Sequence, residues 1–201
     1  MFSLDISAVT GKAHVAYLRR YLLRARAMLK TPLCEMSVAL VGNRKMAELH
    51  ERFMNIPGPT DVLTFELDHD GKGRVTAGEV VVCVPFAVNQ AKKRGVAVRK
   101  ELLLYGLHGM LHLCGLDDRN EVDFAHMHHR EDEILKRLGV GAVFHCLGGA
   151  KVAANGFGEA KKALTPALSR GTGRGSKRVR ANATGKRVHL PMPPQSTRGG
   201  R

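Results

Sequence analysis

The chain has 201 residues, enough for one domain with a hydrophobic core, and its 32 Lys and Arg outnumber 18 Asp and Glu to give a net charge of +14. No apolar run reaches the length that spans a bilayer, and the N-terminus lacks the pattern of a secretory signal, so we expect an unexported protein with no membrane partner. The cysteines, Cys34, Cys83, Cys114 and Cys146, stand singly, which fits the reducing cytoplasm and excludes an obvious disulfide framework.

The first part of the chain predicts a helix, a strand and a second, shorter helix. Apolar residues recur at steps of three and four through residues 13–30, which indicates an amphipathic helix. Its apolar stripe consists of Val15, Leu18, Leu22, Ala25 and Leu29. Residues 36–42, MSVALVG, predict a strand, and residues 44–54 predict a short helix.

Two further strands and three helices are expected up to residue 138. The turn PGPTD at residues 57–61 precedes the strand VLTFEL, and a polar loop separates it from a strand at residues 79–84. Helices are expected from Pro85 to about Arg94, over residues 98–114 and over residues 121–138, ending at Gly95, Gly115 and Gly139. The mixed order predicts an α+β fold, a small mixed sheet covered by helices, within a domain of residues 1–150.

Residues 151–201 differ in composition from the rest of the chain. They hold 12 of the 32 Lys and Arg and one of the 18 acidic residues, which leaves a net charge of +3 for residues 1–150. Stretches such as GTGRGSKRVR cannot bury enough apolar surface to offset the entropy of ordering, so we expect a basic, low-complexity, disordered tail. A solvated extension without specific function is favoured over a nucleic-acid-binding arm.

The segment LHGMLHLCGLDD, residues 107–118, has the spacing of a metal site. His108 and His112 lie one helical turn apart on the same face, so both imidazoles can reach one point. Gly115 lets the chain leave the helix and turn back, which can bring Asp118 to that point. Two nitrogens, one carboxylate oxygen and one open position are typical of catalytic zinc, so the spacing predicts one Zn²⁺ on this C-terminal helix and the loop after it.

Other interpretations of these polar residues stay open. His108 and His112 can be core histidines with satisfied hydrogen bonds and Asp118 a helix cap, although burying two unpaired imidazoles is costly. Asp117 competes with Asp118 as the ligand, or orients a ligand histidine. The next helix carries a polar stretch that we expect to be a solvent-exposed face. Its members are His126, His128, His129, Glu131, Asp132 and Glu133.

The histidine spacing also occurs in metzincin peptidases, H-E-x-x-H-x-x-G-x-x-H, in which the glutamate after the first histidine is the general base. Gly109 fills that place in this chain. Without the base, amide hydrolysis loses a proton-transfer contribution of roughly a hundredfold or more. A metallopeptidase is therefore the second choice of function.

Several motifs in the same order resemble the YbeY family. HGMLHLCGLDD, followed by MHHREDEIL at residues 127–135, is similar to the family hallmark H-G-x-L-H-L-x-G-x-D-H and the helix after it. PTDVLTF at residues 59–65 and GEVVVC at residues 78–83 are similar to other family segments. The members are bacterial rRNA maturation factors regarded as metal-dependent single-strand endoribonucleases. The resemblance implies RNA near the 3′ end of small-subunit rRNA as substrate and the assembling small ribosomal subunit as partner.

Two positions depart from the family pattern. Asp118 stands where members usually have histidine, and an anionic ligand lowers the net charge of a divalent site. Members also commonly have an arginine a few residues before the PTD segment, thought to act near the phosphate, and Met54 occupies that place. Arg52 is only two residues away, but on a helix that is about 200° around the axis.

The chemistry expected from these residues is metal-assisted phosphodiester hydrolysis, with His108, His112 and Asp118 as the metal-binding and catalytic residues. Cations are needed to offset the charge that develops on the phosphate. The candidates for this substrate-binding role are Arg52, Lys92, Lys93 and Arg94. A third hypothesis is a non-catalytic, ribosome-associated protein with a structural metal, which Met54 and the basic tail favour.

Overall fold

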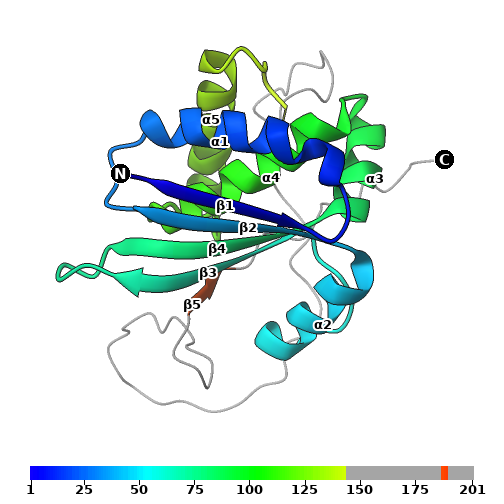
Figure 1. Cartoon of the computed structure of the whole chain (residues 1–201), viewed down its shortest axis with the longest axis horizontal. Helices are drawn as coiled ribbons and strands as arrows, with labels where there is room; N and C mark the ends of the chain where they lie inside the picture. Colours follow the sequence, from blue (N-terminus) through cyan, green and yellow to red (C-terminus); the bar gives the residue numbers. More distant parts are fainter. Residues whose placement is uncertain (144–186, 190–201) are drawn as a thin grey trace.

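The computed structural model describes residues 1–143 and 187–189, so most of the expected tail, including its predicted disorder, lies outside the described residues. The described chain is a mixed sheet with helices on both faces (Figure 1). The α+β class predicted from the sequence is confirmed. No helix within these residues is long and apolar enough to cross a membrane.

The sheet has five strands in the order β1-β2-β4-β3-β5. Their bounds are Ser3–Ala8 for β1, Glu35–Val41 for β2, Val62–His69 for β3, Val75–Cys83 for β4 and Arg187–His189 for β5. β1, β2 and β4 run parallel, whereas β3 is antiparallel to both β4 and β5. The three predicted strands are confirmed, although β4 begins earlier than expected. β1 was not predicted, and neither was β5, which lies within the tail expected to be disordered.

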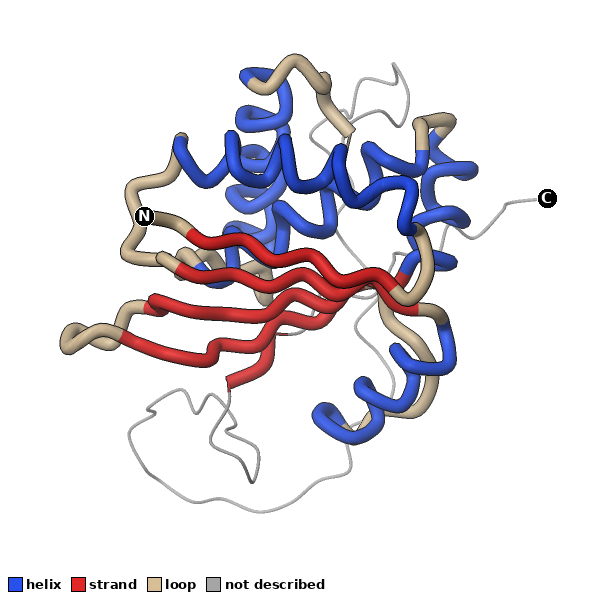
Figure 2. Tube along the Cα trace, viewed as in Figure 1, coloured by secondary structure: helices blue, strands red, loops and turns tan. Residues whose placement is uncertain are grey.

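The helices form two unequal layers around this sheet. Their bounds are Val15–Ala27 for α1, Asn43–Met54 for α2, Val84–Arg94 for α3, Val98–Leu113 for α4 and Glu121–Arg137 for α5, with a short 3₁₀ helix, η1, at Lys12–His14. All the predicted helices are confirmed. α1, α4 and α5 lie on one side of the sheet and α2 lies on the other (Figure 2).

Helix α4 is the buried centre of the larger layer. Every residue from Glu101 to Leu113 is buried. The helix lies against β3 and β4, and α1, α3 and α5 pack around it. A helix that is enclosed in this way is apolar nearly all round, which the sequence LLLYGLHGMLHL shows. The two histidines of the predicted metal site therefore lie in the interior.

Two glycines allow α4 to approach the sheet closely. A Cβ at Gly109 would lie 2.6 Å from a methyl carbon of Val80 on β4 and 3.0 Å from the hydroxyl oxygen of Thr64 on β3. A Cβ at Gly78 on β4 would lie 2.3 Å from a methyl carbon of Leu113 on α4. Contacts this short do not persist in packed interiors. Gly109 is thus required for packing, and a glutamate at this position has no room.

Replacing Gly109 with alanine is expected to lower the free energy of unfolding by about 1–3 kcal/mol, because the added methyl group overpacks the contact between helix and sheet. Urea denaturation followed by circular dichroism measures the change. Gly71→Ala is the matched control, since a Cβ there meets no atom within 4 Å. Equal stability of the Gly109→Ala protein and the wild type would contradict the packing role.

Candidate metal centre

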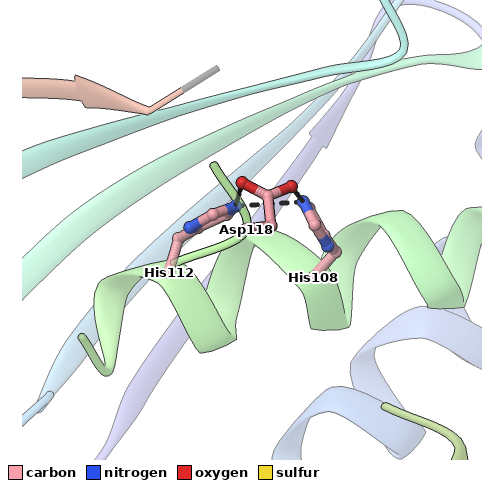
Figure 3. Close-up of side chains that lie close together, drawn as sticks. All are labelled: His108, His112 and Asp118. Atoms are coloured by element: carbon pink, nitrogen blue, oxygen red, sulfur yellow. Dashed lines mark hydrogen bonds and ion pairs between the residues drawn. The ribbon is translucent and has the colours of Figure 1, made fainter. Parts of the chain in front are cut away.

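Three predicted side chains meet at one point: His108 and His112 from α4 and Asp118 from the loop after it (Figure 3). One potential ligand atom from each lies within 4.8 Å of the others. The exposed fractions of the residues are 7%, 2% and 2%. Gly115 has a φ of +92°, which a residue with a side chain rarely adopts, and this turn brings Asp118 back over α4.

Hydrogen bonds fix which nitrogen of each imidazole faces the cluster. His112 Nδ1 donates to the carbonyl oxygen of Leu116 over 2.9 Å, and His108 Nδ1 donates to Oε1 of Glu131 over 2.6 Å. Carbonyl and carboxylate oxygens only accept, so both Nδ1 atoms carry the hydrogen. Each neutral ring therefore turns the lone pair of its Nε2 atom toward the shared point.

The two imidazoles and the carboxylate lie close enough to share one ion, with a different oxygen of Asp118 facing each ring. The two Nε2 atoms are 3.0 Å apart. Oδ2 of Asp118 lies 3.5 Å from Nε2 of His108, and Oδ1 lies 3.7 Å from Nε2 of His112. Ligand atoms bound about 2.0–2.2 Å from a tetrahedral zinc ion are about 3.3 Å from one another. The three side chains can thus hold one such ion without a large rearrangement.

Two features of the cluster are unfavourable without a cation. The Nε2 lone pairs of His108 and His112 face each other and repel unless a proton or a metal ion lies between them. Oδ1 of Asp118 is buried without a hydrogen-bond partner, which typically costs about 1–3 kcal/mol. The alternative of core histidines with satisfied hydrogen bonds explains the partners of the Nδ1 atoms, but not the facing Nε2 atoms or the unpaired oxygen of Asp118. Asp118 is also not the helix cap, because the side chain of Asn120 caps α5.

Burial and neighbouring charges shift the pKa values of His108 and Asp118. Burial acts to lower the pKa of His108, but the hydrogen bond to Glu131 and the charges of Glu131 and Asp118 raise it above the ordinary value. Burial raises the pKa of Asp118, and the charge of His108 offsets part of this. The carboxylates around His108 thus favour a positive charge at the cluster.

The neighbouring aspartate has other partners. Both carboxylate oxygens of Asp117 accept hydrogen bonds from the guanidinium of Arg119, and Oδ1 also accepts from the backbone nitrogen of Asp118. Of the two aspartates that compete for the ligand role in the sequence, the structure brings Asp118 to the histidines. Asp117 braces the loop instead.

Asp118→Asn is expected to weaken zinc binding by roughly a hundredfold or more, because it removes the anionic ligand. Loss of a residue that only hydrogen-bonds to a ligand typically weakens metal binding about 10–100-fold, and loss of a direct ligand should cost more. Asp117→Asn is the matched control and should bind zinc nearly as tightly as the wild type. Competition with a chromophoric chelator measures both affinities. The reverse order of effects would assign the ligand role to Asp117.

The polar stretch on α5 is not the solvent-exposed face that the sequence predicted. His128, Glu131 and Asp132 are 8%, 0% and 3% exposed. Glu131 accepts hydrogen bonds from both His108 and His128, and Asp132 accepts one from the backbone nitrogen of Val143. His126 and His129 are exposed, and the side chain of Glu133 is 41% exposed. Partners on other segments bury the polar side chains, so the prediction was wrong for half of the stretch.

The predicted substrate-binding cations lie apart from the cluster. Arg52 is exposed on α2, across the sheet from α4. Lys92 and Lys93 are exposed at the end of α3. Arg94 instead forms a 3.0 Å ion pair with the fully buried Glu101, which precedes His108 on α4 by seven residues, about 10 Å along the helix axis. Contacts of these four residues with RNA stay predictions.

Two further charged residues adjoin the cluster and were not singled out in the sequence. Asp61, in the PTD segment, is close enough for its charge to raise the pKa of His108. Arg119 follows Asp118 directly and is 57% exposed at its side chain. The PTD resemblance was a signal for Asp61, whereas nothing in the local pattern marked Arg119.

Known proteins resemble this chain in sequence. The family model described as Endoribonuclease YbeY matches residues 7–139. Endoribonuclease YbeY of Thermobifida fusca is 38% identical over 144 residues, which is 66% of this chain and 92% of that protein. The protein of the same name from Beutenbergia cavernae is 42% identical over 122 residues, 57% of this chain and 80% of that protein. A solution structure of a Thermotoga maritima protein is 26% identical, with a TM-score of 0.49, and covers 68% of this chain and 92% of that one.

Proposed function

The chain belongs to the endoribonuclease YbeY family, and on that premise we propose that it is a zinc-dependent endoribonuclease that cuts single-stranded regions of rRNA. The known role of the family is rRNA processing. We place the substrate near the 3′ end of small-subunit rRNA, with the assembling small subunit as partner and the cytoplasm as compartment. The proposed metal-binding and catalytic residues are His108, His112 and Asp118.

The observation that carries this proposal is the pair of Nε2 lone pairs facing each other beside an unsatisfied carboxylate oxygen. Two imidazole nitrogens and one carboxylate suit zinc, whereas magnesium prefers an all-oxygen shell with several waters. Three protein ligands leave one tetrahedral position for a water or a substrate oxygen. That is the arrangement of a catalytic site, since structural zinc sites are usually closed by a fourth protein ligand.

A bound zinc ion supplies a Lewis acid that polarises a phosphoryl oxygen and lowers the pKa of a bound water. The protein holds the ligand rings in place through the carboxylate of Glu131 and the carbonyl of Leu116. Arg119 is exposed beside Asp118, and its guanidinium, although paired with Asp117, can also contact a neighbouring phosphate of the bound strand.

The structure argues against one alternative function, the metallopeptidase, and leaves the other, a non-catalytic metal-binding protein, as a candidate. The peptidase requires a base at the position of Gly109, where a Cβ would already lie 2.6 Å from Val80. A non-catalytic protein with a structural metal is the second candidate, and Met54 favours it. Met54 packs, partly buried, against the apolar cluster under α2, at the place where the family commonly has an arginine.

One experiment separates the three functions. The zinc-loaded wild type is incubated with end-labelled single-stranded RNA, with the same RNA in a duplex, and with denatured casein. We expect internal cleavage of the single strand, little cleavage of the duplex and none of casein. Casein hydrolysis would establish a peptidase, and one zinc per chain without RNA cleavage would establish the non-catalytic protein.

We also propose that residues 1–150 form the metal-dependent domain and residues 151–201 a basic tail, although strand β5 of this tail pairs with β3. Removing residues 151–201 takes away 12 of the 32 Lys and Arg, together with strand β5. The truncated protein is expected to keep its zinc and to bind RNA more weakly, with a smaller salt dependence, because fewer phosphate contacts release fewer counterions. RNA titrations at several salt concentrations measure this. Loss of zinc on truncation would contradict the boundary.

A further inference from the structure

A single buried carboxylate connects the metal cluster to helix α5. Glu131 is 0% exposed, and each of its oxygens accepts one imidazole hydrogen bond. Oε1 accepts from Nδ1 of His108 over 2.6 Å, and Oε2 accepts from Nδ1 of His128 over 2.5 Å. Both contacts are short, as expected for hydrogen bonds to an ionised acceptor. Neither oxygen of Glu131 therefore depends on water.

His128 is held on two sides by rings. Its ring is nearly parallel to that of His108, at 19° and a centroid distance of 6.1 Å. Phe124, one turn earlier on α5, meets His128 edge to face at 4.2 Å. With Nδ1 fixed by Glu131 and the ring packed against Phe124, His128 has little freedom to turn. The bridge from α5 to His108 is consequently rigid.

This rigidity matters because Glu131 does two things for His108. The hydrogen bond sets the tautomer, so that Nε2 carries the lone pair, and it fixes the direction in which that lone pair points. A histidine that donates to a carboxylate is also a better electron donor at its other nitrogen. If His128 were absent, Oε2 would be a buried oxygen without a partner, and Glu131 would be free to rotate or to take up a proton.

We propose that Glu131 and His128 form a positioning unit that holds His108 in its metal-binding orientation. The inference rests on the proposed function only in taking His108 as a ligand. Neither residue is placed on the metal or on the RNA. Glu131 acts through His108, and His128 acts through Glu131 by keeping both carboxylate oxygens occupied.

The test measures metal binding rather than cleavage. Cobalt(II) replaces zinc as the probe, because its visible absorption reports both affinity and ligand geometry. Glu131→Gln keeps the size of the side chain but can accept only one of the two imidazole hydrogen bonds. We expect it to bind cobalt 10–100-fold more weakly than the wild type, with a changed absorption band. Glu133→Gln, on the same helix with its side chain 41% exposed, is the control and should match the wild type.

A second pair of variants tests His128 independently of the folding of Glu131→Gln. His128→Asn retains a donor near the position of Nδ1 and should keep cobalt affinity within about threefold of the wild type. His128→Leu fills similar space without a donor and should lose roughly tenfold or more. Thermal unfolding of the metal-free proteins shows whether each variant is folded before cobalt is added.

Each outcome is decisive. Equal cobalt affinity and spectra for the wild type, Glu131→Gln and His128→Leu would overturn the positioning unit while leaving the metal site intact. If Glu131→Gln does not fold, equal affinity of the two His128 variants overturns the proposal, and the expected difference between them upholds it. Failure of the wild type to bind cobalt would contradict the proposed function itself, and the positioning unit with it.

Discussion

Replacing His112 with alanine is expected to remove the bound metal ion and to slow RNA cleavage by about a thousandfold or more. The side chain supplies one of two nitrogen ligands, and its Nδ1 is already committed to the carbonyl of Leu116. With His112 gone, His108 and Asp118 alone form too weak a site. Loss of the ion removes several kcal/mol of transition-state stabilisation, and each 1.36 kcal/mol is a factor of ten in rate.

The control for His112→Ala is His129→Ala, which truncates an exposed histidine on α5. Metal per chain is measured by mass spectrometry of the purified proteins, and cleavage is measured with the same single-stranded RNA. His129→Ala should match the wild type in both. If His112→Ala lost its zinc but cleaved RNA at the wild-type rate, the activity would belong to a contaminant, and the non-catalytic function would be supported.

Replacing Arg94 with alanine is expected to lower the free energy of unfolding at neutral pH by about 3–5 kcal/mol, the range for breaking one side of a buried ion pair. Glu101 is fully buried, and Arg94 is its cationic partner at 3.0 Å. Burial raises the pKa of Glu101, and the charge of Arg94 limits that rise. Without Arg94 the pKa rises further, so the loss of stability should be largest at high pH and should shrink as acid protonates Glu101.

Chemical denaturation at several pH values measures this dependence. Lys93→Ala, an exposed change beside Arg94, is the control and should alter stability by no more than about 0.5 kcal/mol. Adding Glu101→Gln to Arg94→Ala should restore part of the lost stability, because it removes the unpaired charge. A stable Arg94→Ala protein with weakened RNA binding would return Arg94 to the substrate-binding role that the sequence suggested.

The ligand cluster was predictable because its geometry is local. His108 and His112 are one turn apart on any helix, and Gly115 marks the reversal that returns Asp118. Helix α4 itself was predictable from the apolar residues on either side of the histidines and from Gly95 and Gly115 beyond its two ends. The sequence favoured Asp118 over Asp117, and the structure brings Asp118 rather than Asp117 to the two histidines.

The supporting residues were not predictable, because their partners are distant in the sequence. Glu131 lies 23 residues beyond His108, and a polar face on α5 looks solvated unless the packing of α4 against α5 is known. Strand β1 was missed for a related reason. It has only Leu4 and Ile6 buried, and its pairing with β2 decides its conformation.

The sequence and the structure give different reasons for Gly109. In the sequence, Gly109 stands where a peptidase would have its general base. In the structure it is the point at which α4 lies against Val80 and Thr64. The close approach accounts for the glycine independently of any lost activity.

We propose that one metal ion, held by His108, His112 and Asp118, is required for the cleavage of RNA. It is tested most directly by stripping the wild-type protein with a chelator and following cleavage of single-stranded RNA while zinc is added back. We expect no cleavage by the stripped protein and a linear recovery that stops at one zinc per chain. Full cleavage by the stripped protein, unchanged on adding zinc, would contradict it.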